Sequence, residues 1–305
     1  MAEASGAPKR WSICVVTPTK NRHKLIQRLY ESLALQTDTD FTWLVVDDGG
    51  SDATLPWLQS QVESAPFPVN ILVNHTNRGK CSCLNRAFAH LEADFYLVVD
   101  SDDRLLPDAI EIVRTKLARV YEDRSIGAIF FGYLGHDALP IGLPSDNRDI
   151  VMYRSEMDGS RGKYDGCVGY TSSVVSTLRY PEFEAETYVG PTVLQLLMEP
   201  TYKILFAGDV IGVAEYQLDG LTAAGRALRL RNPLGMMCYA RLCAATAVTT
   251  KQRVKYRISY WAYEKVQCRP PSAAELEALR PQPPAGVYKT CGRLLAAYWQ
   301  SRATT

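Results

Sequence analysis

The first hundred residues alternate between short apolar runs and amphipathic stretches. Runs rich in β-branched residues predict buried strands, and leucine and isoleucine at helical spacing, as in 23–35, predict helices. Strands that alternate with helices in this way are typical of an α/β fold, a doubly wound, mostly parallel sheet with helices on both faces. The predicted strands are 11–17, 41–46, 69–73 and 95–99, and the predicted helices are 23–35, 53–63 and 80–91.

The pattern becomes less regular beyond Pro107, where a further helix is expected to begin. The stretch 134–147 is rich in glycine, proline and aspartate and is expected to be a surface loop. Further predicted strands are 128–132, 202–206 and 210–216, and the predicted C-terminal helices are 233–247, 252–266 and 287–300, with linkers at 269–271 and 280–284.

Polar clusters follow three of the predicted strands. Thr17-Pro18-Thr19-Lys20-Asn21-Arg22 ends the first strand, Asp47-Asp48 the second, and Asp100-Ser101-Asp102-Asp103 the fourth. In open parallel sheets, ligands bind at the carboxyl ends of the strands. Alternate carboxylates directly after a buried strand favour a site for a hard divalent cation, although a solvated turn before the next helix also explains them.

Two further motifs suit a nucleotide, and each also has a plain structural explanation. Asp48 lies in the string DDGGSD, where a carboxylate accepts hydrogen bonds from a base or ribose and the glycines allow close approach; a turn that caps a helix explains it equally well. Asn77-Arg78-Gly79-Lys80 precedes a predicted helix, an arrangement that suits a diphosphate. A surface loop is the alternative for this second motif.

The strings VVTPTKNR, VVDDGGSD, NRGKCSCLN and YLVVDSDD, in this order, resemble glycosyltransferase family 2, an inverting group with the GT-A fold. Weaker similarity at 183–189, 215–222 and 231–235 is to bacterial members that build surface polysaccharides or modify small molecules. The resemblance implies a nucleoside-diphosphate sugar donor, UDP-linked, and a divalent cation, Mn²⁺ or Mg²⁺. The implied substrate-binding residues are Thr17, Pro18, Lys20, Asp48, Asn77, Lys80, Asp100 and Ser101, and the implied metal ligands are Asp102 and Asp100.

The sequence departs from the family where a general base is expected. Relatives carry an acid at the start of the helix after 183–189, whereas this chain has Gly190-Pro191-Thr192. Inverting transfer to a hydroxyl requires a base. Within 164–199, where we expect the acceptor pocket, Glu186 is the first candidate, with Glu184 and Asp165 behind it; each is equally explained as a solvated loop carboxylate.

A lipid-linked phosphate acceptor is an alternative, because its oxygen is already ionised and needs no base. The basic and aromatic stretch 251–265 would then lie against an anionic membrane, or else form an amphipathic helix packed on its own domain.

Composition narrows the classes of partner. The 305 residues are 47% hydrophobic with a net charge of +1, so no nucleic-acid partner is expected. MAEASGAPKR lacks an apolar secretion signal, which favours a cytoplasmic location, with contact at the inner membrane face left open. Cys81 and Cys83 do not have the spacing of zinc ligands, and most of the eight cysteines are expected to be buried.

We therefore expect a GT-A domain over 1–225, which binds the nucleotide sugar and catalyses the transfer. A helical extension over 226–305 would cap the acceptor site or mediate self-association. The acceptor, whether glycan, lipid-linked or small molecule, stays open. A nucleotidyltransferase would instead carry a glycine-rich basic loop where Pro18-Thr19-Lys20 stands, and an inactive sugar-nucleotide-binding scaffold would explain the missing acid at Pro191-Thr192.

Overall fold

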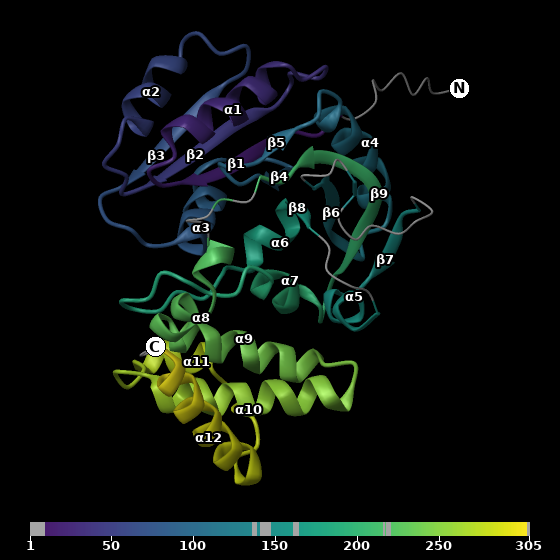
Figure 1. Ribbon diagram of the computed structural model, residues 1–305. Helices are drawn as coiled ribbons and strands as arrows, with labels where there is room; N and C mark the ends of the chain where they lie inside the picture. The colour runs from purple at the N-terminus through teal and green to yellow at the C-terminus, as the bar shows by residue number, and fades with distance from the viewer. Residues whose placement is uncertain are drawn as a thin grey trace.

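The computed structural model describes residues 10–135, 139–140, 148–160, 165–215, 217 and 221–303. Within these residues a nine-stranded sheet lies between two layers of helices, and further helices pack beneath the second layer (Figure 1). Most of the predicted loop 134–147, part of the string 215–222 and the first nine residues lie outside the described residues.

The alternation predicted for the first hundred residues is confirmed. Four strands pair in parallel in the order β3-β2-β1-β4, and the connecting helices lie on both faces (Figure 1). The elements are β1 (Ile13–Thr19), α1 (His23–Ala34), β2 (Thr42–Asp48), α2 (Thr54–Gln61), β3 (Val69–Asn74), α3 (Lys80–His90) and β4 (Phe95–Val98).

The second half of the sheet is mixed. β8 (Gly166–Thr171) lies antiparallel between β4 and β6 (Ile126–Leu134), and β9 (Lys203–Val213) is parallel to β6. The short strands β5 (Arg104–Leu105) and β7 (Ile150–Met152) are antiparallel to β9. The prediction of a mostly parallel sheet is confirmed, but the pattern did not indicate the three reversed strands.

The prediction of two strands at 202–206 and 210–216 was wrong, because β9 is one strand with a bulge. Its pairing with β6 passes from Phe130↔Phe206 to Gly132↔Val210, so β9 carries extra residues between these pairs. Gly208 N donates to Asp149 Oδ1 over 3.0 Å, and Lys116 Nζ lies 2.7 Å from Asp209 Oδ2. These polar contacts satisfy the residues that interrupt the apolar pattern.

The helices form three groups (Figure 1). α1, α2 and α4 (Ala109–Glu122) cover one face of the sheet, while α3, α6 (Ser172–Thr177) and α7 (Val193–Met198) lie on the other, with α5 (Arg154–Ser160) following β7. Below them pack α8 (Leu221–Arg231), α9 (Pro233–Thr246), α10 (Thr250–Val266), α11 (Ala273–Ala278) and α12 (Gly286–Ala303). α11 begins inside the region between the predicted linkers, where Ser272 and Glu275 form a capping box.

One apolar cluster joins the sheet to the C-terminal helices. Val16, Leu44 and Phe130 of the sheet share it with Met237 of α9 and Trp261 of α10. The border predicted at 225/226 falls within α8, whose helix is interrupted at Gly225, with φ 50° and ψ −123°. The division into two domains stays a prediction. Helices α9 and α10, which belong to the predicted extension, share a hydrophobic core with the sheet.

The basic and aromatic stretch 251–265 forms most of α10, and its aromatic side chains at 260, 261 and 263 are buried in the molecule. This burial is what the packed amphipathic helix predicts. No helix in the described part of the chain has both the length and the apolar character required to span a bilayer.

Candidate functional site

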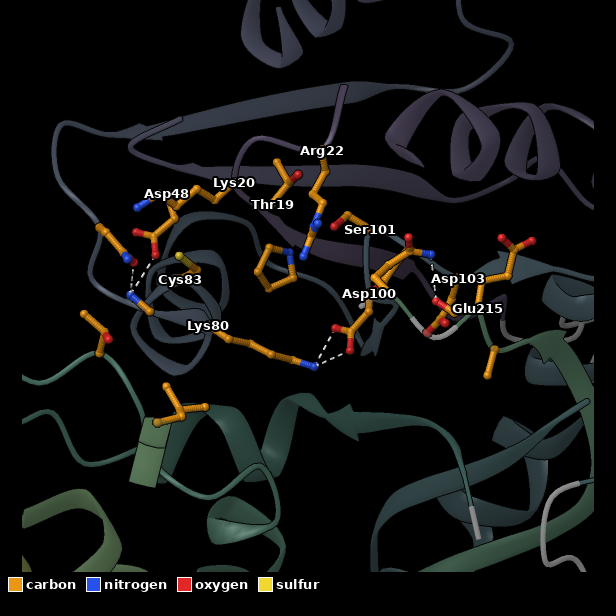
Figure 2. Close-up of a pocket in the computed structure, with 18 of the residues that line it drawn as sticks. Thr19, Lys20, Arg22, Asp48, Lys80, Cys83, Asp100, Ser101, Asp103 and Glu215 are labelled. Carbon is orange, nitrogen blue, oxygen red and sulfur yellow. Dashed lines mark hydrogen bonds and ion pairs between the residues drawn. The ribbon is translucent and has the colours of Figure 1, made fainter. Parts of the chain in front are cut away.

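A cavity of about 380 Å³ opens at the carboxyl ends of β1, β2 and β4 (Figure 2). We call it the donor cavity, after the nucleotide-sugar donor that the sequence predicts for these strand ends. Four of the segments that line it follow β1, β2, β3 and β4, as expected at one edge of a parallel sheet, and others come from later in the chain. The residues predicted from the sequence that line it are Pro18, Lys20, Asp48, Asn77, Lys80, Asp100, Ser101, Asp102 and Asp165.

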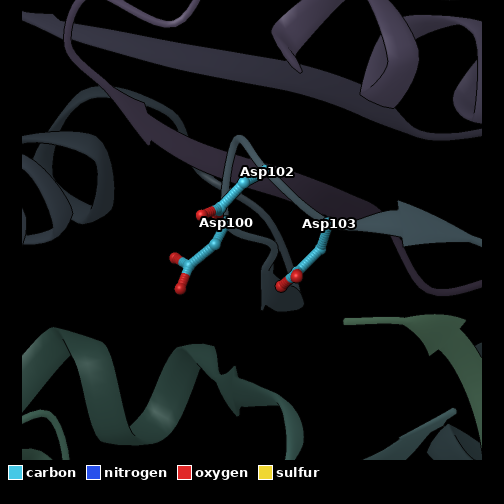
Figure 3. A group of neighbouring side chains, drawn as sticks. All are labelled: Asp100, Asp102 and Asp103. Carbon is cyan, nitrogen blue, oxygen red and sulfur yellow. The ribbon is translucent and has the colours of Figure 1, made fainter. Parts of the chain in front are cut away.

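Three carboxylates gather where β4 ends. One oxygen atom from each of Asp100, Asp102 and Asp103 lies within 4.8 Å of the others (Figure 3). Burial raises the pKa of Asp102 and of Asp103 above the usual value, and the charge of Asp100 raises both pKa values further. Clustered carboxylate oxygens are the ligands that hard divalent cations prefer. The residues present therefore fit such an ion, and Asp103 joins the two ligands expected from the sequence.

Lys80 connects the first turn of α3 to this cluster. Its Nζ donates to Asp100 Oδ2 over 2.7 Å (Figure 2). Burial acts to lower the pKa of Lys80, but the Asp100 carboxylate outweighs it and the pKa is raised, so the side chain stays charged. The preceding Gly79 has φ 85°, and a Cβ there would lie 1.7 Å from the carbonyl oxygen of Thr187. Only glycine permits this approach, which sets the start of α3.

Asp48 fastens the loop that precedes α3. Its Oδ1 accepts from Asn74 Nδ2 over 2.8 Å and from Arg78 N over 2.9 Å, and its Oδ2 accepts from Gly79 N over 2.7 Å. A carboxylate oxygen offers two lone pairs, so Oδ2 retains capacity for a further donor. The side chain therefore has a structural role and also lines the donor cavity.

The prediction that Thr17 binds substrate is not supported by the structure. Thr17 is fully buried, its Oγ1 accepts from Trp43 Nε1 over 3.0 Å, and it does not line the donor cavity. β1 runs on to Thr19, which does line the cavity. The Thr19 Oγ1 is buried without a hydrogen-bond partner among the described residues. An unsatisfied hydroxyl at this edge suits a polar ligand.

Six polar residues that line the donor cavity had no individual role assigned from the sequence: Thr19, Arg22, Asp103, Thr187, Glu215 and Gln217. The Arg22 side chain points into the cavity (Figure 2). Glu215 accepts from Arg104 Nε over 2.9 Å and also pairs with Arg28. All six residues lie within strings that resemble the family: TPTKNR, DSDD, 183–189 and 215–222. The strings therefore indicated the right segments, but not which side chains point into the cavity.

The geometry does not support Glu186 or Glu184 as the general base. Glu186 accepts from the backbone amides of Leu234 and Gly235, each over 2.8 Å, and so caps the first turn of α9. Burial raises the Glu186 pKa more than the two amide hydrogen bonds lower it, so the pKa lies above its usual value. Glu184 is exposed, and neither glutamate lines the donor cavity. Asp165, the third candidate, lies in this cavity beside Asp100 and Asp103.

A second cavity of about 750 Å³ adjoins the first and shares Lys80, Asp100, Asp103 and Asp165 with it. We call it the acceptor cavity because the segment 164–199, where the sequence predicts an acceptor pocket, contributes to its lining. It runs between the sheet and helices α8, α9 and α10, and the segment 187–192 forms part of its wall. Pro191 and Thr192 line it directly before α7 begins at Val193, where relatives were expected to carry an acid.

A mostly parallel α/β sheet with clustered carboxylates at the strand ends and helices over the second face defines a GT-A-like protein. Residues 14–176, more than half of the chain, match the family model described as glycosyl transferase family 2. The chain belongs to glycosyl transferase family 2.

Individual proteins are similar over parts of the chain. The chondroitin synthase of Escherichia coli is 34% identical over 119 residues, which are 39% of this chain and 16% of that protein. The first three curated relatives are matched over 16% to 33% of their own length. S. aureus TarS 1-349 has a TM-score of 0.59 at 17% identity, over 93% of this chain and 78% of that one. The mannosyltransferase PcManGT from Pyrobaculum calidifontis, in complex with GDP-Man and Mn²⁺, has a TM-score of 0.56 at 17% identity, over 97% of this chain and 81% of that one.

Proposed function

We propose that this chain is a metal-dependent, inverting glycosyltransferase that moves a sugar from a nucleoside-diphosphate sugar to an acceptor hydroxyl. The observation that carries the proposal is the convergence of Asp100, Asp102, Asp103 and Lys80 on one cavity at the strand ends. This cavity is built largely within the segment that matches the family. Family 2 membership and the nucleotide-sugar complexes of proteins with the same fold support a donor of this class.

The donor would be divided between two parts of the cavity. Asp48, Lys20 and Thr19 lie on the side formed by β1 and β2, where they would contact the nucleoside. Asp100, Asp102 and Asp103 would hold a divalent cation, Mn²⁺ or Mg²⁺, which when bound supplies positive charge against a diphosphate. We propose UDP as the nucleotide because TarS, which has the same fold, has been crystallised with UDP-GlcNAc and with UDP.

Asp165 is the residue we propose as general base. It lies where the donor and acceptor cavities meet, beside Asp100 and Asp103. The acceptor hydroxyl would give its proton to the Asp165 carboxylate as its oxygen bonds to the anomeric carbon, and the bond from that carbon to the diphosphate would break. Lys80, kept charged by Asp100, would stabilise the negative charge on the departing diphosphate.

An inactive sugar-nucleotide-binding scaffold is the second candidate, favoured by the absence of an acid at Pro191 and Thr192. The two functions differ in whether the donor is consumed. Transfer to water or to an acceptor releases the nucleoside diphosphate, whereas a scaffold binds the donor without releasing it.

Release of UDP from a panel of UDP-sugars, with Mn²⁺ or with a chelator, tests the proposal. We expect Mn²⁺-dependent release that Asp102→Asn lowers by at least about a hundredfold, because the variant removes a carboxylate from the cation site. Asp108→Asn is the matched control, since Asp108 is exposed and lies outside the cavity. Tight donor binding with no release from any donor would favour the scaffold, and full activity of Asp102→Asn would refute the metal site.

A further inference from the structure

We propose that Glu182 is a positioning residue for the transfer, because its carboxylate ties the segment between α6 and α7 to the loop that carries the donor-binding residues. We call these two stretches the α6–α7 segment (178–192) and the donor loop (77–80). The inference rests on the proposed function. It names the contact that would hold the wall of the acceptor cavity in a fixed position relative to the diphosphate of the donor.

The α6–α7 segment depends on side chains for its position. It contains no helix or strand, so its backbone groups are not held by a regular ladder of hydrogen bonds. The segment nevertheless forms part of the candidate site. Thr187 lines both the donor and the acceptor cavity, and 188–192 lines the acceptor cavity. The contacts that hold the segment therefore also determine the shape of the site.

The Glu182 carboxylate accepts hydrogen bonds from three side chains at one side of α3. Its Oε2 accepts from Arg78 Nη2 over 3.2 Å and from Ser82 Oγ over 3.0 Å. Its Oε1 accepts from Asn85 Nδ2 over 2.9 Å. Positions 78, 82 and 85 are four and three residues apart, the spacing that places side chains on one side of a helix. A single carboxylate thus joins the α6–α7 segment to the donor loop and to the helix that follows it.

Asn85 forms a second link to the same segment. Its Nδ2 donates to the carbonyl oxygen of Tyr180 over 2.8 Å, and its Oδ1 accepts from the backbone N–H of Tyr180 over 2.9 Å. The side-chain amide therefore satisfies both backbone groups of one residue, as a neighbouring strand would. All of these bonds require the same orientation of the amide, with its NH₂ group toward Glu182.

The pair of Glu182 and Arg78 contributes more to geometry than to stability. The two side chains are 41% and 60% exposed, and ion pairs as exposed as these add little to the free energy of folding. Arg78 does not line the donor cavity, although Asn77 and Gly79 on either side of it do. Its cation is bound to the α6–α7 segment, so the pair fixes the donor loop to the wall of the acceptor cavity.

This link matters for transfer because the reaction has two sides. The acceptor oxygen and the departing diphosphate lie on opposite sides of the anomeric carbon during an inverting transfer. Lys80 would face the diphosphate, and 188–192 forms the wall on the acceptor side. A displacement of about 1 Å between such groups can lower a rate about a hundredfold. Binding of UDP, in contrast, requires only the donor cavity.

The test is a double-mutant cycle between Asn85 and Glu182. Asn85→Asp places two carboxylates opposite each other at a contact of 2.9 Å, where they repel. Adding Glu182→Gln relieves the repulsion, because the glutamine NH₂ can donate to the carboxylate at position 85 while its oxygen still accepts from Ser82. Each variant is assayed for UDP affinity by calorimetry with Mn²⁺, and for kcat and KM with the UDP-sugar from which the unaltered protein releases UDP fastest.

We expect Asn85→Asp to lower kcat about tenfold or more, and the double variant to have a kcat at least about threefold above that of Asn85→Asp. UDP affinity should stay within about twofold of the unaltered protein, since Asp48 still holds the donor loop. A loss of stability alone would not change kcat under conditions where every variant is folded. The matched control is Glu92→Gln, because Glu92 is exposed just after α3 and lines neither cavity.

Amide hydrogen exchange in the unliganded protein tests the link without reference to activity. Asn85→Asp should speed exchange over 178–189, and the added Glu182→Gln should slow it again.

The outcomes separate the two levels of the proposal. An unchanged kcat in Asn85→Asp, or losses that simply add in the double variant, overturn the positioning role. Equal exchange over 178–189 in all variants overturns it as well. If the unaltered protein releases no UDP from any donor, the proposed function fails instead, and the exchange measurement still decides whether the link holds the segment.

Discussion

Replacement of Glu186 by glutamine separates a structural from a catalytic role for this residue. Both carboxylate oxygens accept backbone amides of the first turn of α9, Leu234 N and Gly235 N, at 2.8 Å. In Glu186→Gln the amide oxygen still accepts one of these N–H groups, while the new NH₂ faces the other. The variant should therefore lose one charge-assisted hydrogen bond and the favourable charge at the helix N-terminus.

The expected loss of stability follows from these two contributions. A hydrogen bond to a charged group contributes about 1.5–3 kcal/mol, and we take the low end because Glu186 is only half-buried and water replaces part of the lost contact. A charge near a helix N-terminus adds about 0.3–1 kcal/mol. Glu186→Gln should lower the free energy of unfolding by about 2 kcal/mol.

Urea unfolding and donor turnover, measured on the same preparations, check this prediction. Glu186→Gln should unfold at lower urea and keep its turnover below the transition. Asp165→Asn should behave in the opposite way, with stability retained and turnover reduced by about a hundredfold or more as a lost general base. A stable Glu186→Gln protein that has lost its turnover would refute the structural role and restore Glu186 as the base.

Three other substitutions have distinct expected outcomes. Thr17→Val leaves the buried Trp43 indole N–H without its acceptor and should cost about 1–3 kcal/mol in urea unfolding with UDP affinity unchanged. Thr19→Val removes a hydroxyl that has no partner in the described structure, so stability should hold while UDP affinity, measured by calorimetry, falls about three- to tenfold; unchanged affinity would remove Thr19 from the site. Hydrogen bonds from Arg269 lower the folded pKa of Glu275 from 4.5 to about 2, so its contribution to stability is present above 4.5 and is lost as the pH falls toward 2. Glu275→Gln should reduce this acid-dependent loss in urea unfolding across that window, and an unchanged pH profile would contradict the assignment.

The N-terminal sheet could be predicted because each strand is a continuous apolar run and each connection carries a helical pattern. β5 and β7 could not, since two or three residues at the edge of a sheet leave no period to detect. β8 reads GCVGYT, in which two glycines interrupt the apolar pattern. Gly169 is required there because a Cβ would lie 2.1 Å from the ring of Phe95, a constraint that depends on the neighbouring strand.

The sequence predicted which loops form the candidate site, but it did not predict all of the side chains that point into it. Strand ends indicated which segments meet, but the sequence does not state that β1 continues to Thr19 or that Asp103 turns toward Asp100. The contacts of Glu186 could not be predicted for a similar reason. Its partners belong to the start of α9, 48 and 49 residues further along the chain, and only the tertiary structure brings them together.

The apolar cluster that extends from the sheet into α9 and α10 has a consequence for protein engineering. Exchange of acceptor specificity between relatives by grafting the C-terminal helices would cut through this cluster, because Met237 and Trp261 share it with Val16 and Leu44. A chimera would need to carry both sides of that contact from one parent. Altering the lining of the acceptor cavity residue by residue avoids the cut and leaves the hydrophobic interior intact.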